Sequence, residues 1–197
     1  MTEKFSLNEG EKLVKLARKA ISFQLSTGRQ YFEPAPEKRF EERRGVFTTL
    51  NTYPENGLRG CIGLPYPDEK VWNAVMSSAS SAAFSDPRFP QVSASEFENI
   101  TVEVSILTKP RPLDKKKLEG EIKIGKTGLI IQGKGRSGLL LPQVASDYGW
   151  DMETFLEQAC LKAGLQKNAW KELDVQILGF EAQVFHEKEP EGKVEEA

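Results

Sequence analysis

The chain has 197 residues with 27 basic and 29 acidic side chains, and its net charge of -2 excludes proteins that hold nucleic acid or anionic membranes by general charge. Hydrophobic residues make up 39% of the chain, which is enough for a buried core and excludes disordered and collagen-like proteins. The length predicts one domain with two lobes. There is no bilayer-length apolar run and no secretory pattern at the start, so we expect a cytoplasmic protein with no membrane or nucleic-acid partner.

The usual ligands of structural zinc are few: Cys61, Cys160 and His186 are the complete set of cysteines and histidines. Structural zinc takes four such ligands, so these three residues, far apart in the chain, predict no metal site. A Ser-His-Asp triad would need His186, which stands next to a charged C-terminal segment and is a poor candidate. We therefore expect neither a metal nor a cofactor.

The first hundred residues alternate between helix and strand patterns. A capping box at the start and apolar residues at helical spacing predict a helix over residues 7–27. Two prolines and dense charge predict an exposed loop over residues 33–44. The Asn56-Gly57 turn signal lies between strand patterns at 46–50 and 58–64, which predicts a hairpin.

A second helix is expected from residue 67 to 83, with small residues that allow a neighbour to approach closely. Strict alternation over residues 100–106 predicts the clearest strand of the chain, and residues 109–112 are expected to link the two lobes. The remaining predicted elements are strands at 122–124, 129–132, 139–141 and 175–185, two helices that begin near Pro142 and Asp151, and a disordered charged tail at 187–197.

Two glycine patterns match nucleotide-binding motifs by letter but stand in the wrong context. Residues 120–127 fit G-x-x-x-x-G-K-T, yet a phosphate loop needs a buried strand before it and a helix after it. A polar segment precedes this pattern and a strand-like segment follows, which predicts a hairpin turn over residues 125–128. Residues 133–138 fit G-x-G-x-x-G, but a further strand follows instead of a helix, which predicts a second hairpin loop.

The segment Leu58-Arg-Gly-Cys-Ile-Gly63 has the greatest chemical interest. Strand alternation places Arg59 and Cys61 on one face, and the glycines leave the backbone beside the cysteine accessible. Because a guanidinium favours a nearby thiolate, we expect a lowered pKa and high reactivity for Cys61. The alternative is that Cys61 is a core residue and Arg59 pairs with a carboxylate. Cys160 lies on the apolar stripe of its helix, so we expect it to be buried.

Charged residues in two other segments are candidates to join Cys61. Two prolines stiffen the loop at residues 85–90, which presents Asp86 and Arg88 as a clamp for a carboxylate or phosphate. The alternative is a helix cap with a surface ion pair. Glu103 faces away from the apolar row of its strand, so it converges with Arg59 and Cys61 if their strands share one sheet.

Four segments of the chain carry a resemblance to a known family: Leu58-Arg-Gly-Cys-Ile-Gly63, Ser85-Asp-Pro-Arg-Phe-Pro90, Glu103-Val-Ser-Ile-Leu-Thr108 and Leu141-Pro-Gln-Val-Ala145. In this order and spacing they resemble the AMMECR domain family over almost the whole chain. The resemblance implies a compact archaeal or bacterial member with an α+β fold. It further implies a barrel-like mixed or antiparallel sheet with flanking helices and duplicated strand-helix units. One domain is then expected over residues 1–186, with lobes at about 1–108 and 113–186.

The family has no established reaction, and its prokaryotic members occur beside a Memo-type protein and a radical S-adenosylmethionine protein. The resemblance therefore implies these proteins as partners, by association alone.

Two functions remain open. In the first, the protein binds a small molecule or a partner in a cleft of Cys, Arg, Asp and Glu side chains around Cys61 and Glu103, with Arg59, Gly60, Asp86 and Arg88 as the ligand-binding residues. In the second, it is a cysteine-dependent enzyme acting on a small polar or acidic substrate, with Cys61 and Glu103 as the catalytic residues. The shortage of histidine as a general base favours binding.

Overall fold

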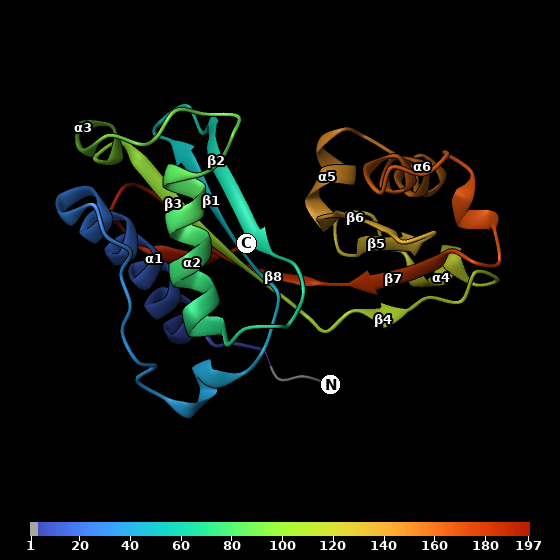
Figure 1. Cartoon of the computed structure of the whole chain (residues 1–197), viewed down its shortest axis with the longest axis horizontal. Helices are drawn as coiled ribbons and strands as arrows, with labels where there is room; N and C mark the ends of the chain where they lie inside the picture. Colours follow the sequence, from blue (N-terminus) through green and yellow to red (C-terminus); the bar gives the residue numbers. More distant parts are fainter. Residues whose placement is uncertain (1–3) are drawn as a thin grey trace. The chain divides into compact units, whose positions relative to one another are not determined.

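The computed structural model describes residues 4–197; residues 1–3 of the predicted domain lie outside the described residues. The fold is mixed α+β, as predicted, with two separate sheets. Both sheets of the described residues are open, so the barrel-like arrangement implied by the family resemblance is absent from this part of the chain. The chain forms two compact units (Figure 1). The first unit runs to Ile106 and includes Gln183–Ala197, and the second unit is Leu107–Ala182.

The first unit contains a sheet of strand order β2-β1-β3-β8-β9. Its strands are β1 (Val46–Thr52), β2 (Leu58–Leu64), β3 (Ile100–Leu107), β8 (Ala182–Glu187) and β9 (Val194–Glu196). Its helices are α1 (Leu7–Thr27), α2 (Val71–Phe84), α3 (Ala94–Phe97) and the 3₁₀ helix η1 (Lys38–Glu41). Helices α1 and α2 pack against each other, and α2 covers β1 and β2 (Figure 1).

Local signals in the sequence set the limits of α1 as predicted. Ser6 and Glu9 form the capping box at its start, and Gly28 ends it in the left-handed region at φ 70°. Its buried stripe faces the core of the first unit, while α2 is buried on nearly every side because its serines and alanines allow close packing.

The hairpin of β1 and β2 also forms as predicted, with an irregularity that changes the position of one residue. Leu50 pairs with Gly60, but Asn51 pairs with Leu58, so Arg59 is the extra residue of a β-bulge. Gly60 faces α2, because a Cβ at this position would lie 2.3 Å from the carbonyl oxygen of Ala82. The next residue, Cys61, therefore points to the sheet face opposite α2.

The second unit contains a sheet of strand order β4-β7-β5-β6. Its strands are β4 (Arg111–Pro112), β5 (Gly128–Gly133), β6 (Arg136–Leu140) and β7 (Gln176–Phe180). Its helices are α4 (Leu118–Glu121), α5 (Pro142–Asp147), α6 (Met152–Lys162) and the 3₁₀ helix η2 (Ala169–Lys171). Helix α6 packs on β5 and β6, and this unit has a hydrophobic core of its own.

Several predicted segments differ in the structure. The loop at 33–44 is not wholly exposed, because Phe40 is fully buried between Phe5 and Trp72. Residues 122–124 follow α4 and do not form a strand. Residues 175–185 form two strands in two different sheets, since the chain leaves β7 and enters β8 around Glu181.

The C-terminal tail is ordered, contrary to the prediction from its charge. Strand β9 pairs with β8, and Val194 is buried in the core of the first unit. Glu195 lies between Lys188, at 2.9 Å, and Lys193, at 3.1 Å. Both lysines of this segment are thus paired within a hairpin, which composition alone does not reveal.

Both glycine patterns occur outside any strand-loop-helix context. Residues 120–127 lead from α4 through a turn to β5, so a helix precedes the pattern and a strand follows it. This order is the reverse of a phosphate loop. The prediction of a hairpin over 125–128 is also wrong, because a helix and not a strand precedes the turn. Residues 133–136 form the expected tight hairpin turn between β5 and β6, with Lys134 and Gly135 at φ 52° and 70°.

Candidate functional site

The sheet of the first unit places Cys61 and Glu103 in one row. Both residues pair with Thr49 of β1, the strand between β2 and β3: Cys61 pairs from β2 and Glu103 from β3. Residues that pair across neighbouring strands project to the same face, so these side chains share the face opposite α2. Thr49 donates a hydrogen bond from Oγ1 to Sγ of Cys61 at 3.4 Å. The predicted convergence of Cys61 and Glu103 on one sheet face is therefore present.

The loop after α2 holds the main chain of Cys61. Its N–H donates to Oδ2 of Asp86 at 2.9 Å, and its carbonyl oxygen accepts from Nη2 of Arg88 at 3.1 Å. Strand β2 is at the edge of the sheet, so these two side chains take the place of a neighbouring strand at Cys61. They fix the backbone of the cysteine and, through it, the direction of the thiol.

Asp86 and Arg88 form a buried-to-exposed ion pair. Nη2 of Arg88 lies 2.7 Å from Oδ2 of Asp86, and the Asp86 side chain is 2% exposed while that of Arg88 is 53% exposed. Hydrogen bonds from Arg88 and from the Cys61 N–H hold the pKa of the Asp86 carboxyl well below its usual range. Asp86 is therefore a charged anchor that orients Arg88 at the sheet edge.

The thiol of Cys61 has a raised pKa, and the prediction of a lowered one is wrong. Burial is the largest cause, and the carboxylates of Glu103 and Asp86 raise the pKa further. The Thr49 hydrogen bond and the charge of Arg88 act in the opposite direction but do not outweigh burial. Cys61 is therefore a neutral thiol at pH 7.

Arg59 does not act on Cys61 as the strand pattern suggested. At the bulge its guanidinium turns to α3, where it forms an ion pair with Glu96 and donates to the carbonyl oxygen of Pro90 at 2.9 Å. The side chain is 9% exposed and lies by the Phe89 ring. Arg59 thus follows the alternative interpretation of pairing with a carboxylate, while Arg88 supplies the guanidinium near the thiol.

The two other predicted positions have clear structural roles. Gly60 allows α2 to approach β2, since no side chain fits against the Ala82 carbonyl. Cys160 is fully buried in the core of the second unit, as its helix pattern predicted.

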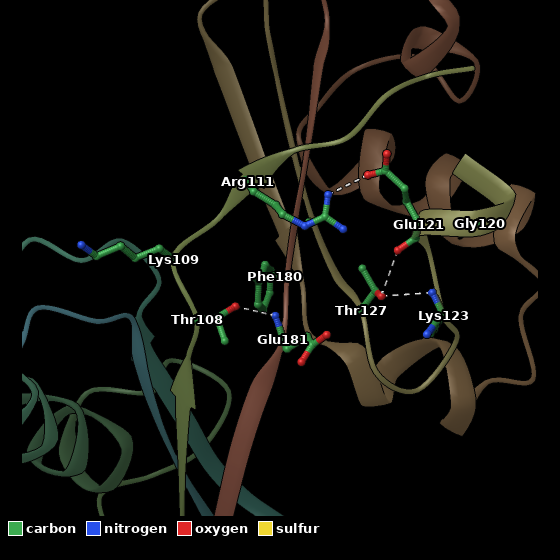
Figure 2. Close-up of a pocket in the computed structure, with 10 residues that line it drawn as sticks. Thr108, Lys109, Arg111, Gly120, Glu121, Lys123, Thr127, Phe180 and Glu181 are labelled. Atoms are coloured by element: carbon green, nitrogen blue, oxygen red, sulfur yellow. Dashed lines mark hydrogen bonds and ion pairs between the residues drawn. The ribbon is translucent and has the colours of Figure 1, made fainter. Parts of the chain in front are cut away.

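One cavity was missed by the motif reasoning, and it lies entirely within the second unit (Figure 2). Its volume is about 250 Å³, and its lining comes from three segments: residues 108–111, 120–127 and 179–181. The G-x-x-x-x-G-K-T pattern includes part of this lining, but the phosphate loop that it matches by letter is not formed. The other segments carry no recognisable motif, because they are far apart in the sequence.

The described residues, 4–197, contain neither a metal-binding cluster nor a membrane-spanning helix. Within these residues, no group of three or more His, Cys, Asp or Glu side chains is arranged to hold a metal ion. No helix in the same part of the chain has both the length and the apolar character to cross a bilayer.

Comparisons with known proteins agree with the motif resemblance. A family model described as AMMECR1 matches residues 14–185. Protein MK0488 of Methanopyrus kandleri is 50% identical over 200 residues, covering 100% of this chain and 97% of its own. Protein MJ0810 of Methanocaldococcus jannaschii is 48% identical over 193 residues, covering 96% of this chain and 95% of its own.

A solved structure supports the same assignment at the level of the fold. The crystal structure of an uncharacterized protein, PH0010 from Pyrococcus horikoshii, matches with a TM-score of 0.89 and 42% identity, over 95% of this chain and 96% of that one. Together with the family model, which spans most of the sequence, this likeness shows that the chain belongs to the AMMECR1 family.

Proposed function

We propose that this protein binds a small polar or acidic molecule at the sheet face that carries Cys61, Thr49 and Glu103, with Arg88 at its edge. The observation that carries the proposal is the double hydrogen bond from the Asp86-Arg88 loop to the main chain of Cys61. The loop fixes the Cys61 main chain, and strand pairing places the Thr49 hydroxyl and the Glu103 carboxylate in the same row. Such fixed polar groups are what a binding site needs for orientation and specificity.

The exposed guanidinium of Arg88 predicts that the ligand carries an acidic group. Its Nε and Nη2 groups bind Asp86 and the Cys61 carbonyl, while its Nη1 group has no hydrogen-bond partner within the described part of the chain. More than half of the side chain is exposed, so this remaining donor is available to an incoming carboxylate or phosphate oxygen. A ligand with an acidic group would bind here through a charge-assisted hydrogen bond.

The raised pKa of Cys61 favours binding over nucleophilic catalysis in the resting protein. The thiolate is the reactive form of cysteine, and burial together with Glu103 and Asp86 disfavours it. A neutral thiol instead offers a weak donor and a polarisable surface to a ligand.

A cysteine-dependent enzyme is the second candidate, and the position of Glu103 is the observation in its favour. This carboxylate stands across Thr49 from Cys61 and could accept a thiol proton once a substrate occupies the row. The two candidates differ in one product: the enzyme forms a covalent adduct on Cys61, and the binding protein does not.

We include a Memo-type protein and a radical S-adenosylmethionine protein among the proposed partners, on the family resemblance alone. Co-elution of the purified proteins by size-exclusion chromatography tests this association. Elution of each protein at its own volume, at concentrations well above those in cells, would remove it from the proposal.

The binding site is tested by alkylation with iodoacetamide, followed by peptide mass spectrometry. We expect Cys61 to be labelled in the native protein and Cys160 only after unfolding, because Cys160 is fully buried. Acetate, succinate and citrate are the probes, and at least one should slow labelling of Cys61 in the wild type and have a weaker effect in Arg88→Gln.

Two results would overturn the proposal: labelling of Cys160 before Cys61, or labelling of Cys61 that none of the three acids changes. A stable mass increase on Cys61 after incubation with a substrate mixture, lost in Cys61→Ser, would favour the enzyme instead.

A further inference from the structure

The cavity of the second unit is lined by residues of that unit alone, whereas Cys61 belongs to the first unit. The polar lining of the cavity comes from residues near the start and the end of the second unit in sequence, Thr108 to Arg111 and Gly179 to Glu181. The segment that ends at Thr127 supplies the rest. Figure 2 shows these segments around one space, with the Phe180 ring among them. Phe180 is 3% exposed, so an apolar ring forms part of the wall.

Hydrogen bonds hold the polar walls of the cavity in place. Thr108 and Glu181 make two bonds: the Thr108 N–H donates to the Glu181 carbonyl at 2.8 Å, and the Glu181 N–H donates to Oγ1 of Thr108 at 2.9 Å. Thr127, which is buried, accepts from the Lys123 N–H at 3.0 Å and so fixes the opposite turn (Figure 2). The cavity is therefore preformed, as ligand sites usually are.

Positive and negative groups occupy different positions around this space. Nη1 of Arg111 lies 2.7 Å from Oε2 of Glu121, and the rest of the guanidinium has no partner within the described part of the chain. The Arg111 side chain is 61% exposed. Glu181 is exposed, and its carboxylate forms no ion pair with any described residue. Lys109 also lines the cavity, but its side chain points away from the other lining residues (Figure 2).

From this arrangement we infer that the cavity binds a small zwitterion of amino-acid type, with its carboxylate on Arg111 and its ammonium group on Glu181. Planar Arg donors match a carboxylate in two-bond geometry, and Glu181 accepts from an ammonium group. The volume of about 250 Å³ lies below the range for drug-sized ligands, which suits a molecule with few heavy atoms.

The charges of the lining argue against ligands with a single kind of charge. An inorganic phosphate would meet the carboxylates of Glu121 and Glu181 as well as the cations. A simple amine would meet Arg111 and Lys123. A zwitterion satisfies Arg111 and Glu181 together, and it leaves the Arg111-Glu121 ion pair intact.

The test uses the full chain and amide chemical shifts in a two-dimensional NMR titration. The probes are L-alanine, L-serine and L-methionine, with L-alaninamide, N-acetyl-L-alanine and inorganic phosphate as probes that lack one of the two charges. We expect saturable shifts at the amides of residues 108–111, 123–127 and 179–181 with at least one amino acid. Binding of the single-charge probes should be at least tenfold weaker.

Variants give a second readout with a matched control. Arg111→Gln and Glu181→Gln should each weaken amino-acid binding at least tenfold. Lys162→Gln removes an exposed charge of the second unit outside the cavity lining and should leave binding unchanged. The side chains of Arg111 and Glu181 are exposed, so the variants should fold, and the wild-type probe series does not depend on them.

Three outcomes would overturn the inference. These are the absence of saturable shifts with all three amino acids, equal or tighter binding of N-acetyl-L-alanine or phosphate, and equal losses in Lys162→Gln and Arg111→Gln. Labelling of Cys61 by iodoacetamide is independent of these outcomes, so failure here leaves the proposed function standing.

Discussion

At the scale of single residues, the arginine that matters to Cys61 is distant in sequence. Arg59 is two positions away, yet the bulge directs it to Glu96. Arg88 is 27 positions away and donates to the carbonyl oxygen of Cys61. Side chains alternate between the two sheet faces only where strand pairing is regular. One extra residue at a bulge shifts the alternation, so a side chain on the far side of the bulge no longer shares the expected face.

The thiol pKa gives a prediction that separates these two arginines. Because the thiolate is the reactive form, the rate of Cys61 alkylation should rise with pH through a midpoint above the value of about 8.5 for a free thiol. Arg88→Gln should move the midpoint higher by removing a positive charge that lowers the pKa, and Glu103→Gln should move it lower by removing a negative charge that raises it. Alkylation rates of the Cys61 peptide across pH measure all three.

Arg59→Gln is the control for that experiment, since its charge is paired with Glu96. It should leave the midpoint unchanged within error. A wild-type midpoint below 8.5 or so, or a shift in Arg59→Gln as large as that in Arg88→Gln, would contradict this account of the thiol environment.

At the scale of elements, both units place a glycine where a helix meets the second strand of a hairpin. A Cβ at Gly60 would lie 2.3 Å from the Ala82 carbonyl oxygen, and a Cβ at Gly138 would lie 2.3 Å from the Ala163 backbone nitrogen. In the first unit α2 follows its hairpin directly, whereas in the second unit α5 comes between β6 and the packing helix α6. Close approach of backbone to backbone, and not a turn, is what requires glycine here.

Alanine at either position should therefore destabilise the protein. We expect Gly60→Ala and Gly138→Ala each to lower the free energy of unfolding by about 1–3 kcal/mol, because backbone atoms of a packed helix cannot move aside easily. Urea denaturation followed by circular dichroism measures the change. Gly120→Ala is the matched control, since no atom beyond its chain neighbours and its own helix backbone lies within 4 Å of its Cβ position. If all three variants unfold at the same urea concentration, helix contact does not explain these glycines.

At the scale of the whole molecule, the first unit is assembled from both ends of the chain. Strand β8 lies between β3 and β9 in its sheet, and Phe185 is fully buried with its ring against Gly10. Glu187 is also buried, where Arg18 binds it at 2.6 Å and the Val102 N–H donates to it at 2.9 Å. The second unit is by contrast one continuous segment with its own core.

This difference predicts how fragments behave. A fragment of residues 107–182 should fold alone and unfold in one cooperative transition, since all of its sheet and core are local to it. A fragment of residues 1–106 should not fold, because it lacks β8 and leaves the Phe185 site empty and Arg18 unpaired. Thermal unfolding by circular dichroism and amide NMR dispersion distinguish the two states. A cooperative transition in the 1–106 fragment would show that β8 and β9 are dispensable.

Local sequence was sufficient for those parts of the protein whose structure depends on near neighbours. The capping box and Gly28 define α1, the Asn56-Gly57 signal marks the first hairpin, and alternation identifies β3. The burial of Cys160 follows equally from its helical stripe. Family motifs spread over most of the chain identified the family, because they sample positions from both units.

Tertiary structure alone decided the features that depend on residues far apart in the chain. The division of residues 175–185 between two sheets, the order of the charged tail and the partner of Arg59 each depend on a contact outside the local segment. The thiol pKa belongs to the same class, since burial and the charges of Arg88, Glu103 and Asp86 set it together. Burial and Coulomb interactions depend on distance in space and not on separation in sequence, so a local pattern carries no record of them.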